Sequence, residues 1–286
     1  MFFENFEVGQ RFAAGPRTVT ADDLEQFTRL SGDDHPMHTS AEYAARTQFG
    51  APVLQGSFGA AVAAGLWTEL GLVSDSIIAG LAESWTYHRP IMVGDQLTLD
   101  ILVVRLQADR DGDRGRVTRY NELCNADGAV VQSGTATAMV RAGGGARSTA
   151  RDVGTAPWGR ALADALGKKA SFVSAVASWD GTIGVRGGDH EIHLRIYRGR
   201  IIDVTPRAPH GATFTFAASD QVWADLLTAP VSRFGARLMT GEFQASGDPY
   251  EYLRLTKALE ILVDTAHEIA RRDHTATANH DDGVTA

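Results

Sequence analysis

Two carboxylates and two imidazoles stand close together in residues 31–38, which read Ser-Gly-Asp-Asp-His-Pro-Met-His. Asp33 and His38 are five residues apart, so a bend between them would bring both side chains to one water molecule. His38 would then act as general base, and Asp33 would orient the water. Pro36 fixes its own φ and favours an extended conformation at His35, so we expect a rigid loop. Spacing alone also fits a local structural role, because Asp and His often bond to nearby backbone groups.

Predicted helices flank this loop. Residues 20–23 read Thr-Ala-Asp-Asp, which resembles a capping box with Asp in place of Glu, and the helix that follows ends near Gly32. Residues 39–42 repeat the cap pattern and begin a second helix that stops near Gly50. Residues 53–70 are apolar on nearly all faces, which predicts a helix covered by other structure.

Strand-like runs come next in the chain, at residues 82–92, 96–106, 115–125 and 129–140. The last two are joined at Asp127-Gly128, a strong hairpin signal. An apolar helix followed by an antiparallel meander predicts a sheet curled around that helix, which is an α+β arrangement.

A Gly-rich segment divides the chain. We predict a first domain at residues 1–142, a linker at 143–155, a second domain at 156–272 and a flexible tail at 273–286. The second domain is predicted to have helices at 157–166, 219–227 and 248–271, and strands at 172–177, 191–197, 200–205, 212–217 and 241–246.

The composition excludes several classes of protein. The net charge of −8 argues against a general nucleic-acid binder, and the lone Cys124 excludes an intramolecular disulfide and a Cys-rich zinc site. Glu4 and Glu7 stand where a secretory signal would be basic and then apolar, so we expect a cytoplasmic protein. The most apolar stretch, residues 51–67, is short and interrupted by polar residues, so we expect no membrane span.

Neither a metal nor a cofactor is expected. The acidic residues and histidines of residues 31–38 lack a further matched cluster of metal ligands. The glycines at residues 143–145 lack the strand-to-helix context of a nucleotide-binding loop.

Three sequence blocks occur in a specific order. They read Gly-Asp-Asp-His-Pro-Met-His at residues 32–38, Phe-Gly-Ala-Pro-Val-Leu-Gln-Gly at residues 49–56, and Arg-Pro-Ile-Met-Val-Gly-Asp-Gln-Leu at residues 89–97. Together they resemble the MaoC-like dehydratase family, which includes (R)-specific enoyl-CoA hydratases, over residues 6–140. The resemblance implies a hot-dog fold, an antiparallel sheet wrapped around a central helix.

The resemblance also implies catalytic roles. Asp33 and His38 would activate water for syn addition across the 2,3-double bond of an acyl thioester, or for the reverse reaction. The backbone N–H of Gly56 would serve as an oxyanion hole for the thioester oxygen. Its predicted place at a helix N-terminus supports this role independently, because unpaired donors and a positive dipole end lie there.

Three positions depart from the family pattern: His35 replaces the usual Asn, Gln55 replaces a His, and Ala64 stands where a serine is usual. His35 adds a titratable group beside the dyad, so either the substrate differs or the site is degenerate. We assign substrate binding to His35, Gln55, Ser57, His88 and Arg89. A strand-end ion pair is the alternative for His88 and Arg89.

The second domain resembles the sterol carrier protein type 2-like domain over residues 157–271, chiefly in the runs at residues 219–227 and 241–248. This resemblance implies an α/β domain with an apolar tunnel for a fatty acyl or sterol-like chain. His190, His193 and His210 have no triad partners at motif spacing. We therefore expect a binding or assembly module.

The sequence thus predicts a dehydratase or hydratase acting on a thioester of coenzyme A or of an acyl carrier protein. Family resemblance and unpaired sheet edges predict a homodimer or larger assembly. Two alternatives stay open: a non-catalytic acyl or lipid binder that keeps both folds, and a hot-dog thioesterase. The Asp-x-x-Pro-x-His loop favours the hydratase over the thioesterase.

Overall fold

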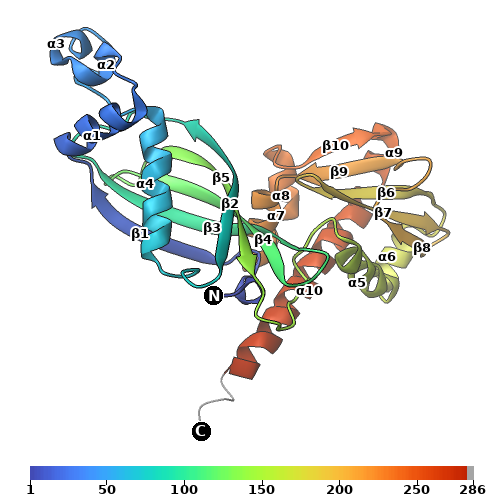
Figure 1. The fold of residues 1–286 in the computed structure, drawn as a ribbon. Helices are drawn as coiled ribbons and strands as arrows, with labels where there is room; N and C mark the ends of the chain where they lie inside the picture. Colours follow the sequence, from blue (N-terminus) through green and yellow to red (C-terminus); the bar gives the residue numbers. More distant parts are fainter. Residues whose placement is uncertain (282–286) are drawn as a thin grey trace. The chain divides into compact units, whose positions relative to one another are not determined.

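The chain folds into two compact units (Figure 1). The computed structural model describes the backbone of residues 1–281 and the side chains of residues 1–272. The first unit contains Met1–Phe6 and Gln10–Gly145, and the second contains Glu7–Gly9 and Ala146–Ala286. The division between Gly145 and Ala146 falls inside the segment predicted as a linker. The sequence did not indicate that residues 7–9 belong with the second unit.

The first unit is an antiparallel five-stranded sheet with one long helix on its face (Figure 1). The strands are, in spatial order, β1 (Arg11–Thr18), β3 (Gln96–Ala108), β4 (Arg114–Cys124), β5 (Val130–Arg141) and β2 (Ile77–Tyr87). Helix α4 (Gly56–Glu69) packs against β1, β3 and β4. The hot-dog arrangement predicted for this half is confirmed.

Two strands of this sheet differ from the prediction. The sequence did not indicate β1, because Gly15 and Pro16 stand in its middle and both residues normally count against a strand. Strand β2 runs from Ile77 to Tyr87, whereas residues 82–92 were predicted. The chain leaves the sheet before Pro90, which cannot donate a ladder hydrogen bond.

The core of the first unit lies between α4 and the sheet. Alternate residues of β3, Leu97, Leu99 and Ile101, are fully buried, as are Val62 and Leu66 of α4. Burying each such side chain contributes roughly 1.5–3 kcal/mol, so this layer holds the helix in place. The opposite face of α4 carries small exposed residues.

Three short helices precede α4. Helix α1 (Ala21–Ser31) begins with the predicted capping box, in which the amide N of Asp23 donates to Thr20 Oγ1 at 3.1 Å. The predicted second helix is a single turn, α3 (Ala41–Ala44), which ends well before Gly50, and the segment predicted as a loop contains another turn, α2 (Pro36–Thr39). The Thr47 hydroxyl donates to the Ala44 carbonyl at 2.8 Å, a local bond that competes with further helix. A 3₁₀ turn, η1 (Phe3–Asn5), precedes β1.

The second unit has a mixed five-stranded sheet. Its spatial order is β10 (Gln244–Gly247), β9 (Phe214–Ala218), β6 (Asp180–Gly187), β7 (His190–Tyr197) and β8 (Arg200–Thr205). Strands β6 and β9 are parallel, and the other pairs are antiparallel. The helices are α5 (Ala156–Gly167), α6 (Ala170–Ala175), α7 (Asp220–Thr228), α8 (Phe234–Met239), α9 (Pro249–Arg254) and α10 (Thr256–Asp281).

Several predictions for this unit were wrong. Residues 172–177 were predicted as a strand but lie largely in α6, which packs against α5 and α10. Strand β6 was missed because it contains three glycines. At Gly184 a Cβ atom would lie 2.1 Å from Thr215 Oγ1, so the neighbouring strand leaves room only for glycine. Helix α8 was also missed.

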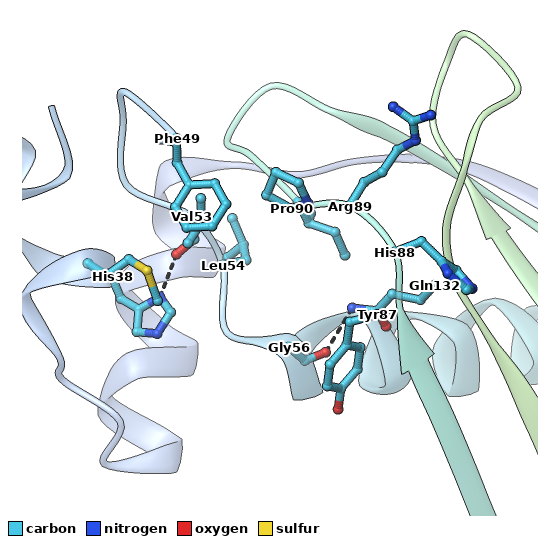
Figure 2. A pocket seen from close by; sticks show the side chains of 12 residues that line it. His38, Phe49, Val53, Leu54, Gly56, Tyr87, His88, Arg89, Pro90 and Gln132 are labelled. Carbon is cyan, nitrogen blue, oxygen red and sulfur yellow. Dashed lines mark hydrogen bonds between the residues drawn. The ribbon is translucent and has the colours of Figure 1, made fainter. Parts of the chain in front are cut away.

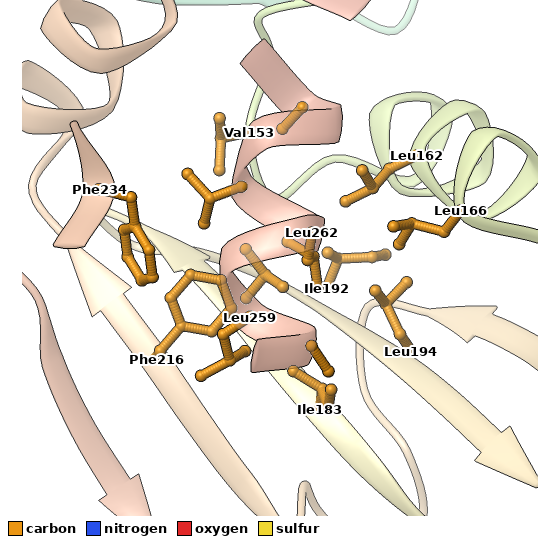
Figure 3. Packing of buried hydrophobic residues seen from close by; sticks show 14 of the residues in the cluster. Val153, Leu162, Leu166, Ile183, Ile192, Leu194, Phe216, Phe234, Leu259 and Leu262 are labelled. Carbon is orange, nitrogen blue, oxygen red and sulfur yellow. The ribbon is translucent and has the colours of Figure 1, made fainter. Parts of the chain in front are cut away.

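The long helix predicted at residues 248–271 is interrupted. Helix α9 ends before the buried Leu255, and α10 then continues to Asp281. Residues 273–281, which were predicted to belong to a flexible tail, are helical, and residues 282–286 lie outside the described residues. Figure 3 shows Leu259 and Leu262 of α10 among buried side chains of the sheet and of α5, including Leu162 and Ile192. The sterol-carrier resemblance of this unit stays a prediction.

Within residues 1–281, no helix combines the length and the hydropathy that crossing a bilayer would require.

Candidate active site

The side chain of His38 is fixed by a hydrogen bond to the backbone. His38 belongs to the single turn α2 and is 7% exposed, and its Nδ1 lies 2.7 Å from the carbonyl oxygen of Val53. A carbonyl oxygen only accepts, so this bond assigns the proton of the neutral ring to Nδ1 and leaves a lone pair on Nε2. The amide of Val53 in turn donates to the carbonyl of Met37 at 3.3 Å.

Asp33 lies opposite that lone pair. Its Oδ2 is 3.6 Å from Nε2 of His38, and its side chain is about half exposed (52%). A carboxylate and an unprotonated Nε2 are both acceptors, so they cannot bond to each other directly. A water molecule can donate one O–H to each of them. The structure therefore brings together the two residues that the sequence singled out.

Gln55 holds the Asp33 loop in place. Its side chain is only 2% exposed, and its Nε2 lies 2.9 Å both from the carbonyl oxygen of Asp33 and from Oγ1 of Thr28. The sequence assigned Gln55 to substrate binding. In the structure its amide nitrogen instead donates to α1 and to the Asp33 loop, and so connects both of them to the start of α4.

Gly56 is the first residue of α4, and the side chain of the preceding Gln55 does not cap the helix. The first N–H groups of a helix have no partner inside the helix, and the positive end of its dipole lies there. The carbonyl of Gly56 accepts from Gln132 Nε2 at 2.9 Å (Figure 2). A Cβ atom at this position would lie 2.9 Å from Cε2 of Tyr87, so the close ring explains the glycine.

His38 and Gly56 border one open cavity of about 400 Å³ (Figure 2). Its lining is mostly apolar, with polar groups from the end of β2 and the following loop. The lining residues are Met37, His38, Phe49, Val53, Leu54, Gly56, Tyr87, His88, Arg89, Pro90, Ile91 and Gln132. His38 also borders a second cavity of about 420 Å³ beside α1. An apolar cavity with a few convergent polar groups is typical of a small-molecule site.

The other predicted site residues divide into two groups. His88 and Arg89 line the cavity, and His88 Nε2 lies 2.8 Å from Ser133 Oγ. Arg89 is exposed, and among the described residues its guanidinium makes no ion pair. Ser57 is exposed and does not line this cavity, and neither does His35, whose Nδ1 accepts from the amide of Met37 at 3.1 Å.

The sequence reasoning missed three contributors to the site. Tyr87 and Gln132 enclose Gly56 from β2 and β5, and no motif marks them. The third is the carbonyl of Val53, a backbone group that leaves no sequence signal. The closeness of Tyr87 to the predicted His88 was the only available hint.

Buried polar groups also lie beneath α4. Arg119 of β4 stacks on the ring of Trp67, with its Cζ 3.8 Å from the ring centroid. Burial lowers the pKa of Arg119 to about 10, and nearby Glu83 opposes this shift. The guanidinium therefore keeps its charge at neutral pH. Within residues 1–272, no group of three or more His, Cys, Asp or Glu side chains is placed to hold a metal.

The first half of the chain is similar to known proteins. The MaoC like domain family matches residues 4–125. The (R)-specific enoyl-CoA hydratase of Aeromonas caviae is 31% identical over 110 residues, which are 38% of this chain and 80% of that protein. The 3-hydroxybutyryl-CoA dehydratase of Methylorubrum extorquens is 28% identical over 144 residues, which are 49% of this chain and 84% of that protein.

Among solved structures, the MaoC-like dehydratase from Rhodospirillum rubrum matches with 28% identity and a TM-score of 0.46. The match covers 50% of this chain and 97% of that one.

Proposed function

The chain belongs to the MaoC-like domain family and is a hydro-lyase, and we propose that its first unit adds water to a 2-enoyl thioester or removes it from a 3-hydroxyacyl thioester. The observation that carries this proposal is the pair Asp33 and His38. Nε2 of His38 lies 3.6 Å from Oδ2 of Asp33. His38 and Gly56 both line the same cavity, whereas Asp33 does not line it. Coenzyme A and an acyl carrier protein are both possible carriers.

The two acceptors activate one water molecule. The water donates one O–H to Nε2 of His38 and the other to Oδ2 of Asp33, and its own lone pair then points at C3 of the substrate. As the C3–O bond forms, an O–H bond of the water breaks and the proton moves to His38. The Asp33 carboxylate stabilises the imidazolium that results, and the hydrogen bond from Nδ1 to Val53 keeps the ring in place.

Negative charge develops on the thioester oxygen in the same step. The N–H of Gly56 at the start of α4 stabilises this enolate, and one such donor is typically worth about 3 kcal/mol of barrier. His38 then returns its proton to C2 on the face from which the water came. The sum is the addition of one water molecule, and both members of the dyad regain their starting charge.

Of the remaining assigned residues, Arg89, His88 and Ser57 bind the substrate, whereas Gln55 and His35 position the dyad and do not touch the substrate. Arg89 is an exposed cation at the cavity and is suited to a phosphate of the carrier. His88 lies next to it, and Ser57 offers a hydroxyl one residue beyond Gly56. Gln55 donates a hydrogen bond to the backbone carbonyl of Asp33 and so positions that residue. His35 caps α2, the turn that carries His38.

Substitution of the dyad tests the proposal. Asp33→Asn and His38→Gln each remove one acceptor, and we expect kcat/KM for hydration of enoyl-CoA substrates to fall roughly 100- to 10,000-fold. His38→Gln keeps a donor for the carbonyl of Val53. Asp34→Asn removes the same charge one residue away from Asp33 and is expected to leave kcat/KM within a few-fold of wild type.

Loss of absorbance of the conjugated thioester at varied chain length gives the rates. Circular dichroism of each variant shows whether its fold is intact. An active wild type whose rate survives both dyad substitutions would contradict the assignment. Release of free thiol in place of hydration would point to a thioesterase.

The proposed assembly is a homodimer or a larger homo-oligomer. Strand β2 is an edge of its sheet, and Ile77, Ile78 and Leu81 on it are each more than 40% exposed. Unpaired edges favour pairing with a second strand. On α4 the exposed Ala64 and Gly65 would let another helix approach closely.

Light scattering after size exclusion tests this assembly. The wild type is expected to show at least twice the chain mass of 30.7 kDa, and Leu81→Lys is expected to shift it toward the monomer because the new charge is buried on association. Ala13→Lys places the same charge on the exposed residue of the opposite edge strand and is the control. A monomeric wild type would contradict the proposal.

For the second unit we propose a site for an apolar chain. In support, large apolar side chains are exposed on α8 and α9: Met239 is 88% exposed, Tyr250 71% and Leu253 69%. We expect a fluorescent fatty acid to bind the full chain, and the double substitution of Met239 and Leu253 by Ser to weaken binding several-fold. Lys168→Ser, at an exposed polar position of the same unit, serves as control. Absence of binding to the wild type would refute the site.

A further inference from the structure

His35 has a defined role in the structure although it does not line the cavity. It is the N-cap of α2, with φ −50° and ψ 139°, and its Nδ1 accepts from the amide of Met37 at 3.1 Å. A ring nitrogen that accepts cannot carry a proton, so neutral His35 is protonated on Nε2. The imidazole of His35 thus accepts a backbone N–H of the first turn, as an Asn side chain normally does at an N-cap.

The cap is connected to the base by a short chain of hydrogen bonds. His35 Nδ1 holds the amide of Met37, the Met37 carbonyl accepts from Val53, and the Val53 carbonyl holds Nδ1 of His38. The amide of His38 also donates to the carbonyl of His35 at 2.8 Å. Other hydrogen bonds of this single turn run from the Ser40 amide to the Pro36 carbonyl at 2.9 Å and from the Thr39 hydroxyl to the Asp34 carbonyl at 3.1 Å, and neither one involves the Met37 amide.

The surroundings of His35 offer no substitute for this bond. Its ring lies edge-on to Tyr43 of α3, with centroids 5.6 Å apart, and its centroid is 6.4 Å from that of His38. The titratable groups that face His35 are therefore Tyr43 and His38, and Asp34 precedes it in the chain. Among the described residues, Nδ1 of His35 has no partner besides the Met37 amide.

We propose that His35 is a positioning residue that makes the site sensitive to acid. When Nδ1 of His35 binds a proton it becomes a donor, so the Met37 amide loses its acceptor and the turn that holds His38 loosens. Histidine is the side chain that gains a proton most readily between pH 5 and 8. An Asn at this position would keep the cap at every pH. The inference rests on the proposed function, because His38 is taken as the base.

Three versions of the full chain separate this effect from the titration of His38 itself. His35→Asn keeps an acceptor at all pH values, and His35→Ala has none. We expect the kcat/KM of the wild type to match that of His35→Asn near pH 8. Near pH 5.5 it should fall toward that of His35→Ala, a loss of about 2- to 30-fold relative to His35→Asn. Taking the ratio to His35→Asn cancels the protonation of His38, which all three share.

A ratio that stays constant from pH 8 to pH 5.5 would overturn the proposal, because a purely structural role lowers the activity of His35→Ala equally at every pH. A second measurement does not depend on turnover. The amide signal of Met37 in ¹⁵N–¹H spectra should shift with pH clearly more in the wild type than in His35→Asn, in which only the shared titration of His38 remains. If no version hydrates any enoyl thioester, the proposed function fails. The pH dependence of the Met37 amide signal then decides by itself whether protonated His35 loses its hydrogen bond to that amide.

Discussion

A hydrogen bond of 2.7 Å, from Nδ1 of His38 to the carbonyl oxygen of Val53, determines which ring nitrogen can act as a base. Because the carbonyl accepts only, the Nε2 lone pair must point toward Asp33. The carbonyl is itself held by the pairing of Val53 with Met37 and by the isolated bridge between Val53 and Met92. The chemistry of the site therefore depends on backbone groups as well as on the dyad side chains.

Other contacts in the first unit hold the backbone around Val53 and the Asp33 loop beside the start of α4. Gln55 joins the Asp33 loop to α1, and Gln132 joins β5 to the carbonyl of Gly56. Both side chains are buried, and a buried amide that loses its partners costs about 1–3 kcal/mol. At Gly59 a Cβ atom would lie 2.2 Å from Oε1 of Gln132, so a small residue is needed there as well. Small residues and buried amides together place a helix N-terminus beside the base.

The sequence predicted the elements that have strong local signals. The capping box before α1, the apolar helix and the Asp127-Gly128 hairpin each depend on neighbouring residues, and each was found. Strand β1 was missed because Gly15 and Pro16 contradict its pairing, and β6 because its glycines are explained only by side chains on other strands. The pairing of Asp33 and His38 was predicted from the three ordered sequence blocks, because their spacing alone also fits a local structural role. The roles of Gln55 and Val53 were not, since both depend on contacts distant in sequence. The cytoplasmic location stays a prediction.

The tautomer of His38 is the most direct test of this account, because a base on Nε2 requires the proton on Nδ1. Long-range ¹⁵N–¹H NMR of the protein labelled in its histidines distinguishes the two nitrogens, and the signals missing from His38→Gln identify the residue. We predict that neutral His38 is protonated on Nδ1. Protonation on Nε2 would mean that the ring cannot accept a proton from water beside Asp33, and it would contradict the account.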